Sequence, residues 1–193
     1  MRVFLLRHAE TAWTLTGQHT GKTELELTPR GREQTLGLRG LFEQLLGGSA
    51  FDAIYVSPRK RARDTAELVF GDCAVTPSDL LAECDYGDYE GLTPAQIRER
   101  APGWTVWNDG CPNGESASQV AARAAAFSEL LRGHPANSVV CAVSHGHFLR
   151  FLTATLLGLA PNLGRIFAIE PGSVAELSDA KGAFQLSLWN RRG

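Results

Sequence analysis

Short apolar runs alternate with longer amphipathic stretches along most of the chain. Residues 3–6 form an apolar run bounded by charge, which is typical of a buried strand. We expect further strands near residues 53–56 and 74–76. The run at 138–143 is almost continuously apolar, the pattern of a strand that is covered on both faces.

Between these runs, several segments carry the start signals and the apolar spacing of α-helices. A Ser or Thr before proline, or before a Gln three residues later, is the sequence mark of a helix N-terminus. The predicted helices begin at Thr28-Pro29, Ser57-Pro58, Thr93-Pro94, Ser116 and just after His147. The first should close at Gly47-Gly48, the second near Phe70 and the last near Leu157.

Alternating stretches at 174–177 and 184–189 predict a C-terminal hairpin. Strands that alternate with helices predict an α/β fold, a three-layer sandwich whose mainly parallel sheet is flanked by helices. Ligands of such sheets bind at the carboxyl ends of the strands. Two predicted strands end in a histidine, His8 and His145, and this edge is therefore the candidate site.

Length and composition fit one globular domain spanning residues 1–193. Hydrophobic residues make up 44% of the chain and charged residues 21%, and the formal net charge of −2 gives no general attraction to nucleic acid or an anionic membrane. A site for an anion must therefore come from local clustering of positive groups. We expect no signal peptide and no membrane helix. The four cysteines form no C-x-x-C pair, so we expect reduced thiols in a cytoplasmic protein.

Four short segments combine residue types that suit phosphate chemistry. A guanidinium just past a buried strand is costly to desolvate unless an anion or a carboxylate meets it. Its planar fork matches phosphate oxygens in pairs. The segments are Arg7-His8, the basic helix start at 57–63, Glu83, and His145-Gly146.

Each segment also has a simpler interpretation. A histidine after a strand can cap the sheet, a basic helix start can be a solvated face, and an acid in a short connection is commonly exposed. Residues 57–63 could also contact nucleic acid, but one short run in an acidic chain supports this poorly. At a shared sheet edge, however, a helix N-terminus adds positive charge and one arginine can point inward.

Hydrolysis of a phosphate monoester requires an anion cradle, a nucleophile and an acid for the leaving alkoxide. Arginines, a neutral imidazole and a carboxylic acid supply all three without a metal or another cofactor. The sequence has no acidic cluster of the two-metal type and no G-x-x-x-x-G-K-[ST] loop. It also lacks a C-x5-R loop, since Cys111 is followed by PNGES. Histidine is the nucleophile that these exclusions leave.

Four segments occur in a familiar order: LLRHAETAWTLTGQHTGKTELELTPRGREQ, SPRKRARDTAEL, LLAECDYGDYEGLT and VSHGHFLRFL. They resemble the R-H-G-[ET]-T-x-x-N start, the S-P-x-x-R-A-x-x-T-A element, the acidic segment and the second histidine of the histidine phosphatase superfamily, also called phosphoglycerate mutase-like. The resemblance extends from residue 3 to about residue 157. It implies the phosphoglycerate mutase-like fold and a metal-independent phosphatase.

The resemblance implies that His8 becomes phosphohistidine and that Arg7, Arg61 and His145 complete the phosphate pocket. Arg61 is favoured over the neighbouring arginines because it directly precedes alanine in the R-A element. Glu83 would donate a proton to the leaving group and later activate water. Further residues are expected near the substrate: Thr14, Gln18, Thr20, Gly21, Tyr86 and Gly146.

Two positions depart from the usual start of the family. Ala9 stands where glycine is common, and because it adds only a methyl group we expect the loop to survive. Thr14 stands where asparagine is common, and its hydroxyl is shorter but can still donate a hydrogen bond. Aromatic and polar residues that could line a sugar-sized pocket are His19, Trp104, Trp107 and Asn108, although the spacing of the tryptophans is also typical of packing.

Within the superfamily, GQHTGKTELELT, DYGDYEGLT and WTVWNDGCPNGES resemble the branch of acid phosphatases and sedoheptulose-1,7-bisphosphatase-like sugar phosphatases. We expect a small phosphorylated metabolite as the substrate, with no nucleic-acid or membrane partner. A phosphoglycerate mutase is the alternative, but little room exists between Gly91 and Ser116 for the closing segment of a mutase. A non-catalytic phosphate-sensing or protein-binding module is an alternative of another class, although such modules typically lose the nucleophile or the acid. A homodimer is an assembly that the sequence leaves open.

Overall fold

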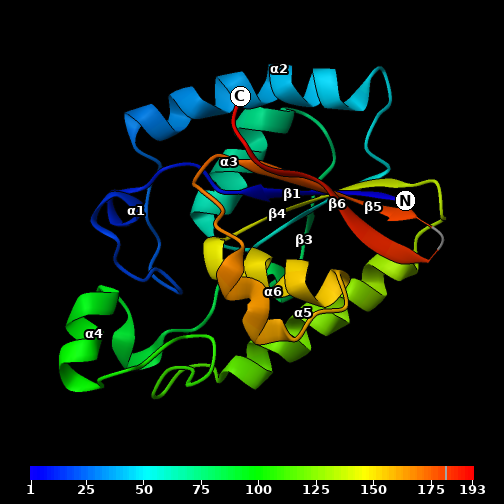
Figure 1. Ribbon diagram of the computed structural model, residues 1–193. Helices are drawn as coiled ribbons and strands as arrows, with labels where there is room; N and C mark the ends of the chain where they lie inside the picture. Colours follow the sequence, from blue (N-terminus) through cyan, green and yellow to red (C-terminus); the bar gives the residue numbers. More distant parts are fainter. Residues whose placement is uncertain (181) are drawn as a thin grey trace.

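Six strands form one mixed sheet in the computed structural model, which describes residues 1–180 and 182–193 (Figure 1). The strand order is β3-β2-β4-β1-β5-β6. Four of the strands are mutually parallel: β1 (Arg2–Arg7), β4 (Val139–Ser144), β2 (Ala53–Val56) and β3 (Thr76–Pro77). The other two, β5 (Val174–Ala180) and β6 (Ala183–Arg191), pair antiparallel and form the predicted hairpin.

Helices cover both faces of this sheet and complete the three-layer sandwich that the sequence predicts (Figure 1). One face is covered by α2 (Pro29–Leu46) and α3 (Lys60–Phe70), the other by α5 (Ala117–Arg132) and α6 (Gly146–Leu156). The short helices α1 (Ala12–Thr16) and α4 (Pro94–Arg100) lie beyond the end of the sheet where β1 finishes. Three 3-10 turns complete the elements, at Asp79–Leu81, Gly87–Tyr89 and Pro161–Ile166.

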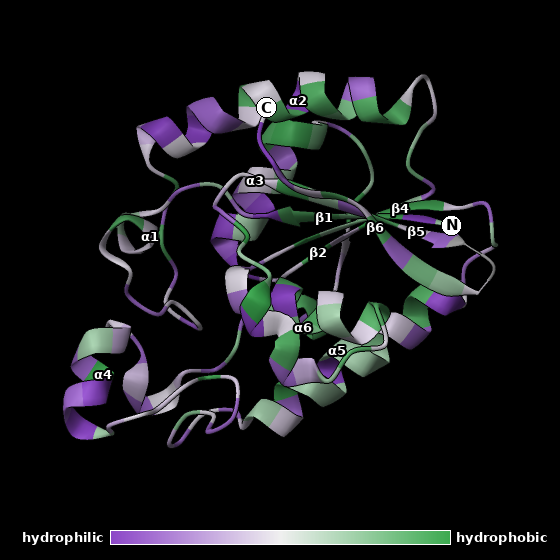
Figure 2. Ribbon diagram, viewed as in Figure 1, coloured by the Kyte–Doolittle hydropathy of each residue, from purple (hydrophilic) through white to green (hydrophobic). Residues whose placement is uncertain are grey.

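The side chains of β1 divide between two cores because successive residues of a strand point to opposite faces. Val3 and Leu5 pack into the core shared with α5 and α6, whereas Phe4 and Leu6 pack into the core shared with α2 and α3. All four are fully buried. Figure 2 shows the same distribution, with the hydrophobic colour concentrated in the strands and on the inner sides of the helices. Burial on both faces explains the continuous apolar runs of β1 and β4.

The predicted caps fix several helix ends. The side chains of Thr28, Thr93 and Ser116 each accept a hydrogen bond from the backbone N–H three residues later. Gly47 adopts a left-handed conformation, with φ of 57°, and closes α2. These local signals therefore set the entry angles of helices on both faces of the sheet.

The predicted start of the helix after β2 is wrong by two residues. The helix begins at Lys60 rather than at Ser57-Pro58. The Ser57 N–H donates to the Val143 carbonyl, at 2.9 Å, so the residue continues the sheet instead of capping a helix.

Two smaller predictions also differ from the structure. The third strand lies at Thr76–Pro77 rather than at 74–76. The segment between His8 and Thr28, for which no helix or strand was predicted, contains α1, which is held by a capping box between Thr11 and Thr14. Within the described residues, no helix is long and apolar enough to cross a membrane.

Candidate active site

The register of the parallel strands brings His8 and His145 together. Arg7, the last residue of β1, pairs with Ser144, the last residue of β4, so the next residue of each strand is a histidine. The His8 N–H donates to the Ser144 carbonyl at 2.9 Å and extends the ladder by one residue. The two imidazole rings lie with their centroids 5.1 Å apart, at an angle of 58°.

The hydrogen bond of His8 determines its tautomer. Nδ1 lies 2.8 Å from the Ala9 carbonyl oxygen, and because a carbonyl can only accept, Nδ1 carries the proton. In the neutral ring Nε2 then holds a free electron pair. Burial lowers the pKa of His8 well below its ordinary value, and the charges of Arg61 and Arg7 act in the same direction. His8 is therefore a neutral imidazole, with Nε2 able to act as a nucleophile.

Arg61 points inward from the first turn of α3 and is fully buried, whereas Arg63 is exposed. Its guanidinium donates to the carbonyls of Thr20 at 2.8 Å, Gly21 at 3.1 Å and Thr23 at 3.2 Å. These carbonyls fix the position of the charge without neutralising it. Burial lowers the pKa of Arg61, but arginine titrates so far above neutrality that the group remains charged.

Arg7 supplies a second guanidinium from the end of β1. Its Nη1 donates to the Ile169 carbonyl at 2.6 Å. Gly146 begins α6 beside it, and a Cβ there would lie 3.1 Å from the Arg7 Cζ. The glycine after His145 therefore makes room for an arginine of the site, rather than only for a ligand.

Several buried nitrogens around His8 have no hydrogen-bond partner. Among the described residues, the buried side-chain atoms without a partner are Arg7 Nε, Arg61 Nε, His145 Nδ1, Arg59 Nε and His19 Nε2. Buried donors are normally satisfied, because an unmade hydrogen bond costs about 1–3 kcal/mol. Two guanidinium nitrogens and an imidazole nitrogen next to one nucleophile form a cradle suited to an anion.

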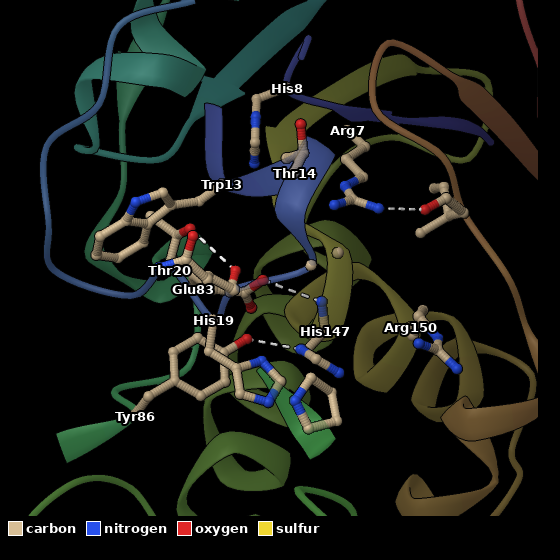
Figure 3. Close-up of a pocket in the computed structure, with 15 residues that line it drawn as sticks. Arg7, His8, Trp13, Thr14, His19, Thr20, Glu83, Tyr86, His147 and Arg150 are labelled. Carbon is tan, nitrogen blue, oxygen red and sulfur yellow. Dashed lines mark hydrogen bonds between the residues drawn. The ribbon is translucent and has the colours of Figure 1, made fainter. Parts of the chain in front are cut away.

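Glu83 is held at the N-terminus of α6, across the pocket from His8 (Figure 3). One carboxylate oxygen accepts from the N–H groups of Cys84 and Phe148, both at 2.9 Å, and the other from the N–H of His147 at 3.0 Å. Three backbone donors leave this carboxylate little freedom to rotate. Arg123 supports the same segment by donating to the carbonyls of residues 80 and 82, both at 2.9 Å.

Ser57 is a site residue that the sequence reasoning treated only as a helix start. Its Oγ lies 2.6 Å from His145 Nε2, and both residues are fully buried. Ser57 directly follows β2, as His8 follows β1 and His145 follows β4. The shared carboxyl edge of the three strands was the signal that could have found it.

The far side of the pocket is built from aromatic and histidine side chains (Figure 3). The Tyr86 hydroxyl lies 2.6 Å from His147 Nδ1, and the His19 ring stacks on Tyr86 with centroids 4.5 Å apart. Burial lowers the pKa of His19 to about 4 and that of His147 well below its ordinary value. Trp104 and Trp107 belong to the hydrophobic core rather than the pocket lining, in agreement with the packing interpretation.

Arg150 is the second arginine that lines the pocket, beside Arg7, and the sequence did not single it out. Its Nε donates to the Gly164 carbonyl at 3.1 Å and its Nη2 to the Arg165 carbonyl at 2.6 Å. The guanidinium lies over the Trp107 ring, 4.4 Å from the centroid. Among the described residues no carboxylate lies within salt-bridge distance of Arg150. Arg150 lies four residues after Gly146, about one helical turn, so the predicted helix places both residues on one face. This spacing was the signal in the sequence that could have identified Arg150.

Most of the residues expected near the substrate line one pocket with a volume of about 220 Å³. They are Arg7, His8, Thr14, Gln18, Thr20, Glu83, Tyr86 and Gly146. Arg61 and His145 are fully buried beside His8 and do not line this pocket. Gly21 does not line it either, and its N–H donates to the Glu90 carboxylate at 2.9 Å.

The two departures from the family start have local explanations. Ala9 is fully buried, its N–H donates to Thr65 Oγ1 at 3.0 Å, and its carbonyl accepts a hydrogen bond from His8 Nδ1–H. The Thr14 hydroxyl donates to the Thr11 carbonyl at 2.8 Å and accepts from the Thr11 N–H at 3.0 Å. Thr14 therefore lines the pocket while its hydroxyl proton is engaged in the cap of α1.

The basic run at 57–63 does not form an open cationic surface. Lys60 contacts Asp64 at 2.9 Å and Glu26 at 3.4 Å, and Arg59 lies 3.8 Å from Glu24. Acidic partners therefore compensate the charges of Lys60 and Arg59. In the described part of the chain, no group of three or more His, Cys, Asp and Glu side chains is placed to hold a metal ion.

A family model described as "Histidine phosphatase superfamily (branch 1)" matches residues 3–192. The chain belongs to the histidine phosphatase superfamily. An acid phosphatase of Mycobacterium tuberculosis is 44% identical to this histidine phosphatase over all of the chain and 93% of the relative. A sedoheptulose 1,7-bisphosphatase of Saccharomyces cerevisiae is 35% identical over 82% of the chain and 68% of the relative.

The fold agrees with this membership. A solved structure of an open reading frame product from Mycobacterium tuberculosis superposes with a TM-score of 0.93 at 42% identity, covering 99% of this chain and 97% of that one. With the full-length match to phosphatases, this establishes the chain as a phosphatase.

Proposed function

We propose that this histidine phosphatase hydrolyses small phosphate monoesters by two displacements, through a phosphoryl group carried on His8 Nε2. The observation that carries the proposal is the buried, neutral His8 ring, whose Nδ1 proton is held by a carbonyl while Nε2 is left free. Beside it lie two guanidiniums and an imidazole with unpaired nitrogens. Such a site attracts an anion and presents a nucleophile to it.

In the first displacement, the ester phosphate enters the cradle of Arg7, Arg61 and His145. His8 Nε2 attacks phosphorus with its free electron pair, a P–N bond forms, and the bond from phosphorus to the ester oxygen breaks. Glu83 gives its proton to that oxygen, which leaves as an alcohol. The Ala9 carbonyl accepts from Nδ1–H throughout and stabilises the positive charge that the ring gains.

In the second displacement, water takes the place of the alcohol. Glu83, now a carboxylate, removes a proton from the water as its oxygen attacks phosphorus. The P–N bond breaks, its electron pair returns to His8 Nε2, and inorganic phosphate leaves. Both steps use one acid-base residue in opposite directions, so one carboxylate fixed by three N–H donors is sufficient.

The leaving-group side of the pocket favours substrates with a second anionic group, such as sugar bisphosphates or phosphorylated acids. Arg150 places an unneutralised charge there, on the side of the pocket away from His8 (Figure 3). The volume of about 220 Å³ suits a small metabolite. The bisphosphatase name of the yeast relative supports the same class.

Hydrolysis is preferred over the mutase alternative because the segment between Gly91 and Ser116 contributes little to the pocket wall. Of the described residues between Gly91 and Ser116, only Pro94 lines the pocket. Water can therefore reach a phosphoenzyme before a second hydroxyl does. The presence of both His8 and Glu83 in one pocket argues against a non-catalytic module. Four unpaired cysteines support a cytoplasmic location.

A panel of phosphorylated metabolites tests the proposal by phosphate release, with His8→Ala as the blank and chelator in excess. Pairs that differ only in a second phosphate test Arg150. We expect Arg150→Met to raise KM about tenfold for the bisphosphate and little for the monophosphate, as for a lost charged hydrogen bond, while Arg165→Met changes neither. Isomerisation of 3-phosphoglycerate faster than phosphate release would contradict hydrolysis as the main activity and would favour the mutase alternative.

A further inference from the structure

The edge strand β6 has an irregularity close to its C-terminal end. Val174 of β5 pairs with Arg191, but Glu176 pairs with Leu188, so β6 contains one extra residue between these pairs. Asn190 lies in this bulge with φ of 55°, a left-handed conformation that asparagine tolerates better than most residues. Bulges commonly re-aim a side chain near a functional site.

The bulge directs two side chains onto the loop at 168–172. The Trp189 Nε1–H donates to the Ala168 carbonyl at 2.5 Å. The Asn190 Oδ1 accepts from the Glu170 N–H at 2.8 Å. The loop is therefore attached to the C-terminal end of the chain at Ala168 and at Glu170, on either side of Ile169.

The same loop contacts the catalytic edge of the sheet. The Ile169 carbonyl accepts from Arg7 Nη1 at 2.6 Å. The Gly172 N–H donates to the His8 carbonyl at 3.0 Å, and the Arg7 N–H donates to the Ser173 carbonyl at 3.1 Å. Among the described residues, the Arg7 guanidinium makes one hydrogen bond, the bond to the Ile169 carbonyl. The direction of that carbonyl thus decides where the guanidinium points.

We propose that Asn190 is a positioning residue for the phosphatase reaction: by holding the Glu170 N–H it fixes the Ile169 carbonyl, and through it the guanidinium of Arg7. Trp189 supports the same loop at Ala168, on the other side of Ile169. Neither side chain lines the pocket, so both act through Arg7. The inference rests on the proposed role of Arg7 in binding phosphate.

The test compares two asparagines in the same backbone conformation. Asn190→Gly keeps the left-handed backbone and removes only the acceptor, because glycine adopts positive φ without strain. Asn113→Gly is the matched control: Asn113 has φ of 56° and an exposed side chain that donates to Asp88. Asn190→Asp keeps an oxygen for the Glu170 N–H and should restore function.

We expect Asn190→Gly to lower kcat/KM for p-nitrophenyl phosphate about tenfold, chiefly through KM, as for a binding group displaced by a fraction of an ångström. Asn113→Gly should stay within about twofold of the unmodified enzyme. Thermal midpoints of the two variants should match. If Asn190→Gly folds poorly, Trp189→Phe removes the bond to Ala168 and should give the same KM effect.

A double-mutant cycle with Arg7→Ala separates positioning from general support. If Asn190 acts through Arg7, Asn190→Gly costs less than about twofold once Arg7 is absent. An equal loss in both backgrounds, or no loss in the unmodified enzyme, overturns the inference. If Arg7→Ala alone loses no activity, the proposed role of Arg7 fails, which is a different result from failure of the inference alone.

Discussion

His8 and His145 occupy equivalent places in the sheet but make different hydrogen bonds. Each follows a central parallel strand, each is buried, and burial lowers the pKa of both. The Nδ1–H of His8 donates a hydrogen bond to a backbone carbonyl, which leaves Nε2 free to attack. His145 has its Nε2 occupied by Ser57, and its Nδ1 is unpaired. Position in the fold therefore makes both rings neutral, and one hydrogen bond distinguishes the nucleophile from its neighbour.

Of the substitutions that test this difference, replacing His8 should lower activity the most. In His8→Ala we expect kcat to fall at least about 10⁴-fold, because no other group in the cradle can accept the phosphoryl group. Phosphate release from an aryl phosphate measures the loss, and the thermal midpoint serves as the control for folding. Residual activity similar to that of His145→Ala would mean that the two histidines share the nucleophilic role.

Replacing His145 should cost less and leave the chemistry intact. We expect His145→Ala to lose about 10²–10³-fold in kcat, the typical effect of removing one donor that stabilises a transition state. The phosphoenzyme should still form. A complete loss of phosphoenzyme in this variant, with folding preserved, would contradict the difference between the two rings.

Acid pH should weaken the fold while His8 stays neutral. Burial lowers the folded-state pKa of His8, His19, His145 and His147, whereas in the unfolded chain each titrates near 6.5. Below pH 6.5 the unfolded chain binds protons that the folded chain does not, so stability present above this pH is lost as the pH falls. Each histidine removes about 1 kcal/mol of unfolding free energy per pH unit in this window.

Urea unfolding at pH 7.5, 6 and 5 measures this slope, and His145→Gln should make it shallower. The window lies above the usual range of carboxylates, which limits their contribution. The kcat/KM for an aryl phosphate should show no loss near pH 6.5 from protonation of His8. A stability that is constant or rises toward pH 5 would contradict neutral buried rings.

Ser57 should have the smallest effect. Removing its hydroxyl in Ser57→Ala frees His145 Nε2 and should lower kcat/KM about fivefold, the value of one hydrogen bond. In the His145→Ala background the same change should have no further effect. A large independent loss would show that Ser57 acts on the substrate directly.

The sequence predicted most of the sheet and helices because their signals are local. Residues 138–143 are apolar without interruption because β4 is buried on both faces, and Thr28, Thr93 and Ser116 cap helices through contacts only three residues long. The parallel order of strands also implied that His8 and His145 share an edge. α1 was missed because five residues with no buried side chain carry no apolar period.

The supporting residues of the site could not be predicted in the same way. Ser57 resembles a helix cap in sequence, and only the register with β4 shows that its hydroxyl reaches His145. Arg150 and Asn190 are separated from Arg7 by more than a hundred residues in the sequence. Only the tertiary fold brings Arg150 into the pocket and Asn190 onto the loop that contacts Arg7. Such roles depend on how the hairpin and α6 pack at the end of β1, which no local pattern encodes.

The most direct test of the account is to identify the atom that carries phosphate during turnover. The enzyme is mixed rapidly with a labelled phosphate ester, quenched in alkali, and digested for mass spectrometry, with NMR used to assign the ring nitrogen. The account predicts one phosphoryl group per chain, on Nε2 of His8, and none in His8→Ala. A phosphoryl group on His145 or on Nδ1 of His8, or turnover with no phosphoenzyme at any time, would contradict it.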